Sequence, residues 1–172
     1  VSLESSTGKF WLDLSNGSFK AGSLELAEKI ELAFCDAAIA SIKKGKIDAT
    51  FSEVKIDESE DLEINSISSR FDIESAKKLE TDSKRDNFII GTVASLKGTS
   101  YFTDLRIDEV EKEINLVTKY GSVRASLLKK SIETVTITSG YTDVDLTFDP
   151  AVSYNLEIRL ANTFLVLPDK NA

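Results

Sequence analysis

The chain has 172 residues, of which 41% are apolar and 29% are charged, which fits one soluble domain with a sizeable core. Its 29 acidic and 21 basic side chains give a formal net charge of −8, which disfavours a nucleic-acid-binding protein. Histidine is absent, and the single cysteine, Cys35, can form neither an internal disulfide nor a thiolate metal cluster. No apolar run reaches the roughly 20 residues that span a bilayer, and no stretch has the pattern of a signal peptide.

Taken in chain order, short apolar–polar–apolar segments recur in pairs every 17–21 residues, and such alternation predicts strands with one buried face. The apolar positions of the first segments are Phe10/Leu12, Ile30/Leu32, Ile47/Ala49, Leu62/Ile64, Leu79/Thr81, Leu96/Gly98, Ile114/Leu116, Val135/Ile137 and Leu156/Ile158. Those of the second segments are Phe19/Ala21, Ala37/Ile39, Val54/Ile56, Phe71/Ile73, Phe88/Ile90, Leu105/Ile107, Val123/Ala125, Val144/Leu146 and Leu165/Leu167. Only Thr81 and Gly98 in these columns are not apolar.

This period is too short for a strand–helix–strand unit but fits a coil in which equivalent strands of successive repeats pair. The sequence therefore predicts an all-β fold, a single-domain right-handed parallel β-helix (β-solenoid) of about nine coils with two main strands per coil. The domain covers 1–172, with the repeat array at about 10–167, a remnant of an earlier coil at 1–9 and a tail at 168–172. A third apolar column closes the coil and consists of Leu24, Ile42, Ala76, Val93, Val110 and Leu128.

Two other folds compete with the solenoid. Residues 24–42 also carry helical spacing at Ala27, Ile30, Phe34, Ala37 and Ile42, but their register with the other coils favours strands. Short strands also suit an antiparallel sandwich, which does not require such column-by-column agreement.

The first residues also follow the repeat. Val1 and Leu3 precede Phe19 and Ala21 by the same interval that separates Ala21 from Ile39, so they resemble the second strand of an earlier coil. We expect at least half a coil and an export signal upstream in the native protein. Alternatively, the apolar edge of this first coil associates with another molecule, because an uncapped edge is a template for pairing.

Three phrases of the sequence carry a family resemblance: LDLSNGSF at 12–19, LEINS at 62–66 and SGYTDVDL at 139–146. A strand running into a Ser-x-Gly-type corner and a second strand resembles the bacterial adhesin-like family of β-strand-repeat cell-envelope proteins, which has no assigned molecular function. The resemblance covers about residues 10–167. In coils 47–107 the corner glycine is replaced by Glu53, Ser68, Arg85 and Phe102 or their neighbours. The resemblance implies an exported protein of the cell surface or periplasm and carries over no site residues.

The sequence offers one candidate metal site, an outward acidic ladder of Glu31, Asp48, Glu63 and Glu80, about 4.8 Å apart if the coils stack. Such carboxylates can bind Ca²⁺, but a solvated acidic face is the preferred interpretation, so no metal and no cofactor are expected. Paired carboxylates also serve glycosidases and lyases, and the neighbouring column supplies cations, but no spacing marks a catalytic pair. We therefore expect no enzyme and no catalytic residue. That neighbouring outward column holds Lys20, Lys55, Asp72, Arg106, Arg124 and Asp145.

The remaining candidates are Cys35, which is expected at a corner as an unreactive residue, and several aromatic side chains at outward or corner positions. Such aromatics either stack on sugars or partner proteins, or pack between coils. They are Trp11, Tyr101, Phe102, Tyr120 and Tyr141. The sequence thus predicts a non-catalytic structural or adhesin-like module with a surface glycan or envelope protein as partner. A scaffold that assembles end to end and a carbohydrate-active β-helix protein remain the alternatives.

Overall fold

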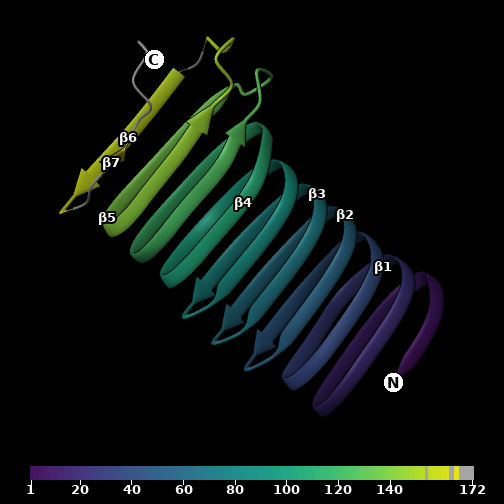
Figure 1. The fold of residues 1–172 in the computed structure, drawn as a ribbon. Helices are drawn as coiled ribbons and strands as arrows, with labels where there is room; N and C mark the ends of the chain where they lie inside the picture. Colours follow the sequence, from purple (N-terminus) through teal and green to yellow (C-terminus); the bar gives the residue numbers. More distant parts are fainter. Residues whose placement is uncertain (154, 163–164, 167–172) are drawn as a thin grey trace.

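The protein is a parallel β-solenoid of about seven turns. The computed structural model describes residues 1–153, 155–162 and 165–166, of which 89% lie in strands and none in a helix. Figure 1 shows the coils stacked along one axis, with the N-terminus at one end and β6 at the other. The strands are β1 (Ser2–Thr50), β2 (Glu53–Ile67), β3 (Arg70–Lys84), β4 (Asn87–Leu128), β5 (Thr134–Phe148), β6 (Asn155–Ala161) and β7 (Leu165–Val166). No helix among the described residues is long and apolar enough to cross a membrane.

All pairing between these strands is parallel, in the order β1-β2-β3-β4-β5-β6 with β7 beside β5. The antiparallel sandwich is therefore excluded, and residues 24–42 lie within β1 rather than in a helix. The strand conformation follows from the sequence, because Val, Ile and Phe alternate with polar residues at period two and suit a pleated surface. The β1 and β4 segments continue around corners, so each contributes to more than one coil (Figure 1).

The predicted columns of the second strand are confirmed where pairing is described. Residues 17 apart face each other from β1 to β4, as in Ile39↔Ile56, Ile56↔Ile73 and Ile73↔Ile90. The spacing of 21 between later coils also holds, because Val144 lies opposite Leu165. The last residue of this column, Leu167, lies outside the described residues.

The predicted register of the first strand is wrong at the step from β1 to β2. The sequence alignment set Ile47 opposite Leu62, whereas the structure pairs Ile47 with Ile64 and Gly45 with Leu62. From Leu62 onward the predicted columns hold, as in Leu62↔Leu79 and Ile64↔Thr81. The error is a shift of two residues, which leaves every side chain on the same face of the strand and so leaves the apolar pattern unchanged.

The core is one continuous stack of apolar side chains that fills the coil from Phe19 to Phe148. The third apolar column is confirmed, because all six of its residues are buried. One coil lacks an apolar residue in this column, and there Ser59 lies between Ile42 and Ala76, buried and without a hydrogen-bond partner for its hydroxyl.

The predicted number of about nine coils is slightly too high. The alignment counted the terminal segments 10–21 and 156–167 as full coils, but Phe10 is only half-buried, and residues 163–164 and 167 lie outside the described part. Val1 lies beside Phe19: the Val1 amine donates to the carbonyl of Ser18 at 2.7 Å, and the Lys20 amide donates to the carbonyl of Val1 at 2.9 Å. Bonds to both chain neighbours of Phe19 are typical of parallel pairing, and they match the interval that the repeat predicts for Val1.

Candidate functional site

The corner between the two strands of each coil has the same backbone conformation along the whole molecule. Nine non-glycine residues among those described adopt a φ between 49° and 59°, and they recur with the period of the repeat. This left-handed conformation costs about 1–2 kcal/mol for a residue with a Cβ atom. The corner residues are Asn16, Phe34, Phe51, Ser68, Arg85, Phe102, Tyr120, Tyr141 and Asn162. The chain therefore accepts local strain at each of these corners.

Buried polar side chains that follow the corners hold them in place. The hydroxyl of Ser69 accepts a hydrogen bond from the amide of Ser52 at 3.1 Å and donates to the carbonyl of Ile67 at 3.1 Å. Ser52 repeats the pattern, accepting from the amide of Cys35 at 3.0 Å and donating to the carbonyl of Thr50 at 2.9 Å. The corners at Phe34, Phe51 and Ser68 are thus linked in series by side chain–backbone bonds.

Asp86 takes the place of this serine in one coil. Its Oδ1 accepts from the amide of Ser69 at 2.6 Å, and its Oδ2 accepts from the hydroxyl of Ser66 at 2.7 Å and the amide of Lys84 at 2.9 Å. Burial raises the pKa of Asp86 above its ordinary value, and these hydrogen bonds partly oppose the shift. Both oxygens are engaged, so this buried carboxylate serves the corner.

Aromatic rings occupy five of the corners and form what we call the aromatic edge, which consists of Phe34, Phe51, Phe102, Tyr120 and Tyr141. The rings stack in two groups: Phe34 on Phe51 with centroids 5.1 Å apart, and Phe102, Tyr120 and Tyr141 at successive distances of 4.7 and 5.2 Å. Four of the five are 50–58% exposed, all except Tyr120. The edge therefore presents apolar surface to solvent although its rings stack on one another.

The two stacks are separated by the corners of Ser68 and Arg85, which carry no ring. Here the surface forms a shallow depression of about 600 Å³, lined by Phe51, Ser68, Arg85 and Phe102 among others. Phe51 stacks only on Phe34, and Phe102 stacks face to face only on Tyr120, among the rings that the structure describes. One face of each ring is thus left toward this gap in the edge.

The aromatic residues that the sequence singled out lie at outward positions or corners, as predicted. Tyr101, Phe102 and Tyr141 are exposed, Tyr120 is partly buried, and Trp11 is exposed in the first coil. Tyr101 meets Phe102 edge-on, with ring centroids 4.9 Å apart. Stacking between coils and exposure to solvent therefore occur together.

Sequence reasoning missed Phe34 and Phe51 as surface residues. The available signal was their spacing of 17, which equals the repeat, and the same spacing from Phe51 to Ser68. The predicted repeat was aligned on its apolar columns, and these columns do not include the corner residues. Glu53, which the sequence placed at a corner, lies two residues beyond the corner residue Phe51, in β2.

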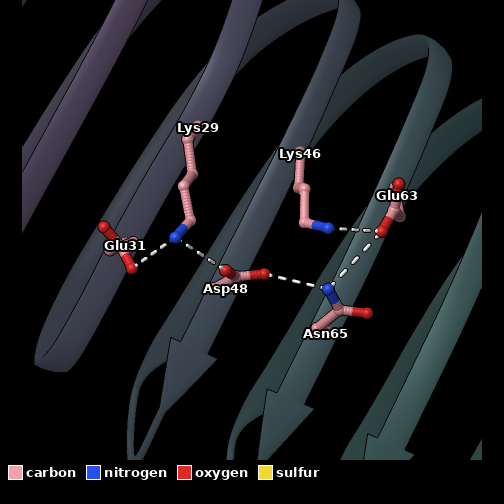
Figure 2. Close-up of polar contacts among 6 residues, drawn as sticks. All are labelled: Lys29, Glu31, Lys46, Asp48, Glu63 and Asn65. Carbon is pink, nitrogen blue, oxygen red and sulfur yellow. Dashed lines mark hydrogen bonds and ion pairs between the residues drawn. The ribbon is translucent and has the colours of Figure 1, made fainter.

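The predicted acidic ladder is not continuous, as Figure 2 shows. Lys29 bridges Glu31 and Asp48, with its Nζ 2.6 Å and 3.5 Å from the two carboxylates. Asp48 lies opposite Asn65 and accepts a hydrogen bond from its amide nitrogen at 3.0 Å. Because of the register shift, Asp48 and Glu63 are not neighbours on successive coils.

The other half of the ladder is also interrupted by cations. Glu63 lies opposite Lys46 and pairs with its ammonium group at 2.7 Å, and Glu80 lies between Glu63 and Lys97. The hydrogen bond to Glu63 is the main cause of a raised pKa of Lys46. Glu63 and Glu80 lie opposite each other, as the sequence predicted. This face is thus a mixed ladder of lysines and carboxylates.

No group of three or more Cys, Asp or Glu side chains suited to a metal ion occurs in the described part of the chain. Cys35 follows the corner residue Phe34 and is buried, and its Sγ donates to the carbonyls of Leu14 and Ala33, both at 3.2 Å. A buried thiol held in this way behaves as a small packing residue.

The chain was also compared with known proteins. It matches no family model, no curated protein and no solved structure.

Proposed function

We propose that the chain is a non-catalytic, adhesin-like module of the cell envelope, exported to the cell surface or periplasm, whose repetitive solenoid surface binds a glycan. The aromatic edge is the observation that carries this proposal. A corner that serves only the fold is best filled by glycine or asparagine, which tolerate positive φ, and asparagine occurs at Asn16 and Asn162. Five of the corners instead carry an aromatic ring, and four of those rings are half exposed.

The chemistry of this edge favours binding over catalysis. Exposed aromatic rings offer stacking faces to sugar rings, and the regular repeat presents them along a line. Asp86 lines the gap, and burial raises its pKa. Both of its carboxylate oxygens are engaged by hydrogen bonds within the corner. A general acid needs an oxygen that can reach a substrate.

The test is a glycan array probed with the chain and with Phe51→Asn and Phe102→Asn variants. Asparagine suits the left-handed corner, so these changes remove rings without adding backbone strain. Trp11→Asn is the matched control, because Trp11 is an exposed aromatic residue away from the edge. We expect glycan binding that both edge variants weaken and the control keeps.

Two outcomes of this experiment would contradict the proposal. Absence of binding to any glycan, together with binding to an envelope protein, would make the chain a protein-binding module. Glycan binding that depends on Trp11 and not on the edge would place the site elsewhere.

We also propose that the coils are right-handed, the sense found in about 98% of parallel crossovers. A right-handed twist of each strand packs back onto its sheet only with this sense. A crystal structure with left-handed coils would contradict the proposal.

A further inference from the structure

The gap in the aromatic edge has the dimensions of missing rings. Where corner rings follow one another, each lies one coil from the next, with centroids 4.7–5.2 Å apart. Phe51 and Phe102 are instead three coils apart, which is roughly 14 Å at about 4.8 Å per coil, and the corners between them are Ser68 and Arg85. The gap is therefore as wide as the space that two further stacked rings would fill.

The position at Ser68 is a slot for a single ring, bounded by the free face of Phe51 and by the Arg85 corner. Ser68 lies one coil beyond Phe51, and its side chain is short. A ring at this level would contact Phe51 on one face as Phe34 does on the other, at a centroid distance near 5.1 Å. We call this position the slot.

The floor of the slot is held by hydrogen bonds of the corners themselves. The amides of Ser68 and Arg85 donate to carbonyls of the next coil, at 2.9 and 2.8 Å. Beneath them, the hydroxyl of Ser69 and the carboxylate of Asp86 accept from backbone amides. These corner amides are engaged, so side chains must recognise a ligand. A floor fixed in this way also lowers the entropy lost on binding.

One wall of the slot is a row of polar side chains on successive coils. Glu53 lies opposite Arg70, Arg70 lies opposite Asn87, and all three line the depression at the gap. The row offers a carboxylate that accepts, a guanidinium that donates and an amide that does both. Among the described ion pairs, Glu53 is held only by Lys55, at 3.9 Å. Its carboxylate can therefore accept hydrogen bonds from a ligand.

The charges around the gap favour an uncharged ligand. Four carboxylates outnumber two guanidinium groups in the lining of the depression, which disfavours an acidic polymer. The two arginines belong to the Ser68 coil and the next one, which disfavours a cationic amino sugar in the slot. Hydroxyl groups donate to carboxylates and accept from guanidinium, so they suit this mixture. The charged lining residues are Asp36, Glu53, Asp86, Asp104, Arg70 and Arg85.

We infer that the slot binds one uncharged pyranose ring, a unit of a neutral hexose polymer. The sugar ring stacks on Phe51, and its hydroxyls donate to Glu53 and accept from Arg70 and Asn87. The depression of about 600 Å³ lies within the ~300–1,000 Å³ typical of small-molecule sites. The inference rests on the proposed function, since it names the class of sugar that the same edge binds and the place where it binds.

The test is a variant that fills the slot. Ser68→Phe adds a ring at a corner whose φ of 54° lies within the 49–56° of Phe34, Phe51 and Phe102, so the backbone already suits it. Asn16→Phe is the matched control, because it adds a ring at a corner with a φ of 55° that lies outside the gap. Urea titration checks that both variants are folded.

Isothermal titration calorimetry measures binding of cellohexaose, maltohexaose and mannohexaose, with hexagalacturonate and a chitosan hexamer as charged counterparts. We expect at least one neutral oligosaccharide to bind more tightly than either charged one. Ser68→Phe should weaken its binding about tenfold or more. Arg70→Leu, which removes a charged hydrogen-bond donor, should also cost about tenfold. Asn16→Phe should bind as the unchanged protein does.

The results that overturn the inference differ from those that overturn the proposed function. If Phe51→Asn weakens glycan binding but a folded Ser68→Phe does not, the edge binds glycans and the slot is not the site. If a charged oligosaccharide binds as tightly as every neutral one, the slot does not select an uncharged sugar. Equal losses for Ser68→Phe and Asn16→Phe would mean that added rings disturb the edge as a whole. Absence of binding to any glycan would overturn the proposed function as well.

Discussion

Asp86 shows how one residue can change the chemistry of a repeat while keeping its geometry. In the two preceding coils a serine accepts the amide of the coil before and donates to a nearby carbonyl. Asp86 accepts the equivalent amide and also accepts from the amide of Lys84 and the hydroxyl of Ser66. A buried charge is thereby held by three hydrogen bonds.

The first prediction separates the hydrogen bonds at this corner from the charge. Asp86→Ala removes the acceptor for the amide of Ser69 and should lower the free energy of unfolding by about 1–3 kcal/mol at pH 7. Asp86→Ser reproduces the preceding coils and should cost less than Asp86→Ala. Urea titration of the three proteins measures both differences. Equal losses for the two variants would show that the corner does not depend on this acceptor.

The raised pKa of Asp86 gives this site a pH dependence. A carboxyl group with a higher pKa in the folded than in the unfolded chain binds its proton more tightly when folded. The penalty for the buried charge is complete above the folded pKa and disappears as the pH falls through it. We therefore expect the stability of the unchanged protein to rise relative to Asp86→Ser between pH 7 and pH 4, by urea titration. A difference that is constant with pH would contradict the shift.

The corner rings lead to a further prediction at this scale. Phe51→Asn loses a stacked ring, worth about 0.5–1.5 kcal/mol, and relieves the left-handed strain, worth about 1–2 kcal/mol. The two effects nearly cancel, so we expect the free energy of unfolding to change by less than about 1 kcal/mol. Phe51→Ala loses the ring and keeps the strain, and should be less stable than Phe51→Asn in urea titration. A loss above about 2 kcal/mol for Phe51→Asn, more than the stacked ring alone is worth, would make the ring a packing residue and remove the argument for its function.

At the scale of the strand, the pattern of apolar residues predicted the buried face more accurately than it predicted the register between strands. The second-strand columns follow from the sequence because their spacing is constant at 17 over four coils. The first-strand register fails between Ile47 and Leu62, because a shift of two residues keeps the same face buried. Two polar contacts accompany the observed register: the amide of Phe51 donates to the carbonyl of Ile67, and Asn65 donates to Asp48.

The candidate site was harder to predict for the same reason. Outward aromatic residues were visible in the sequence, but the stack of Phe34 on Phe51 and the gap at Ser68 depend on corner alignment.

Thr81 is one of the two residues in the predicted columns that are not apolar, and its substitution should change the stability of the strand stack. Its hydroxyl is buried without a hydrogen-bond partner, and it lies opposite Gly98, where a Cβ would collide with the carbonyl of Thr81. Thr81→Val has nearly the same shape without the polar group, so it should raise the free energy of unfolding by about 1 kcal/mol or more. Thr81→Ser keeps the hydroxyl and removes a methyl group, and it should be destabilising. Differential scanning calorimetry measures both, and a destabilised Thr81→Val would show that the hydroxyl has a partner.

The whole molecule is a one-dimensional stack. Among the described residues, each strand contacts only its neighbours in the order of the sheet, apart from β7, which lies beside β5. The stability of such an array is close to a sum over coils and their interfaces, so opening begins where a coil has one neighbour instead of two. The central coils, formed by β2, β3 and the first part of β4, have a neighbour on both sides.

This leads to the last prediction, which concerns hydrogen exchange. We expect the slowest amide exchange in β2 and β3 and faster exchange toward residues 1–20, measured by mass spectrometry on peptides. Leu14→Ala, a change to a half-buried residue of the first coil, should speed exchange there and leave β3 unaffected. Ile73→Ala, a change to a fully buried residue of β3, should cost about 2–5 kcal/mol and speed exchange in the central coils. Equal acceleration along the whole chain by Leu14→Ala would mean that the coils unfold as one unit, and the nearest-neighbour account of this solenoid would then be wrong.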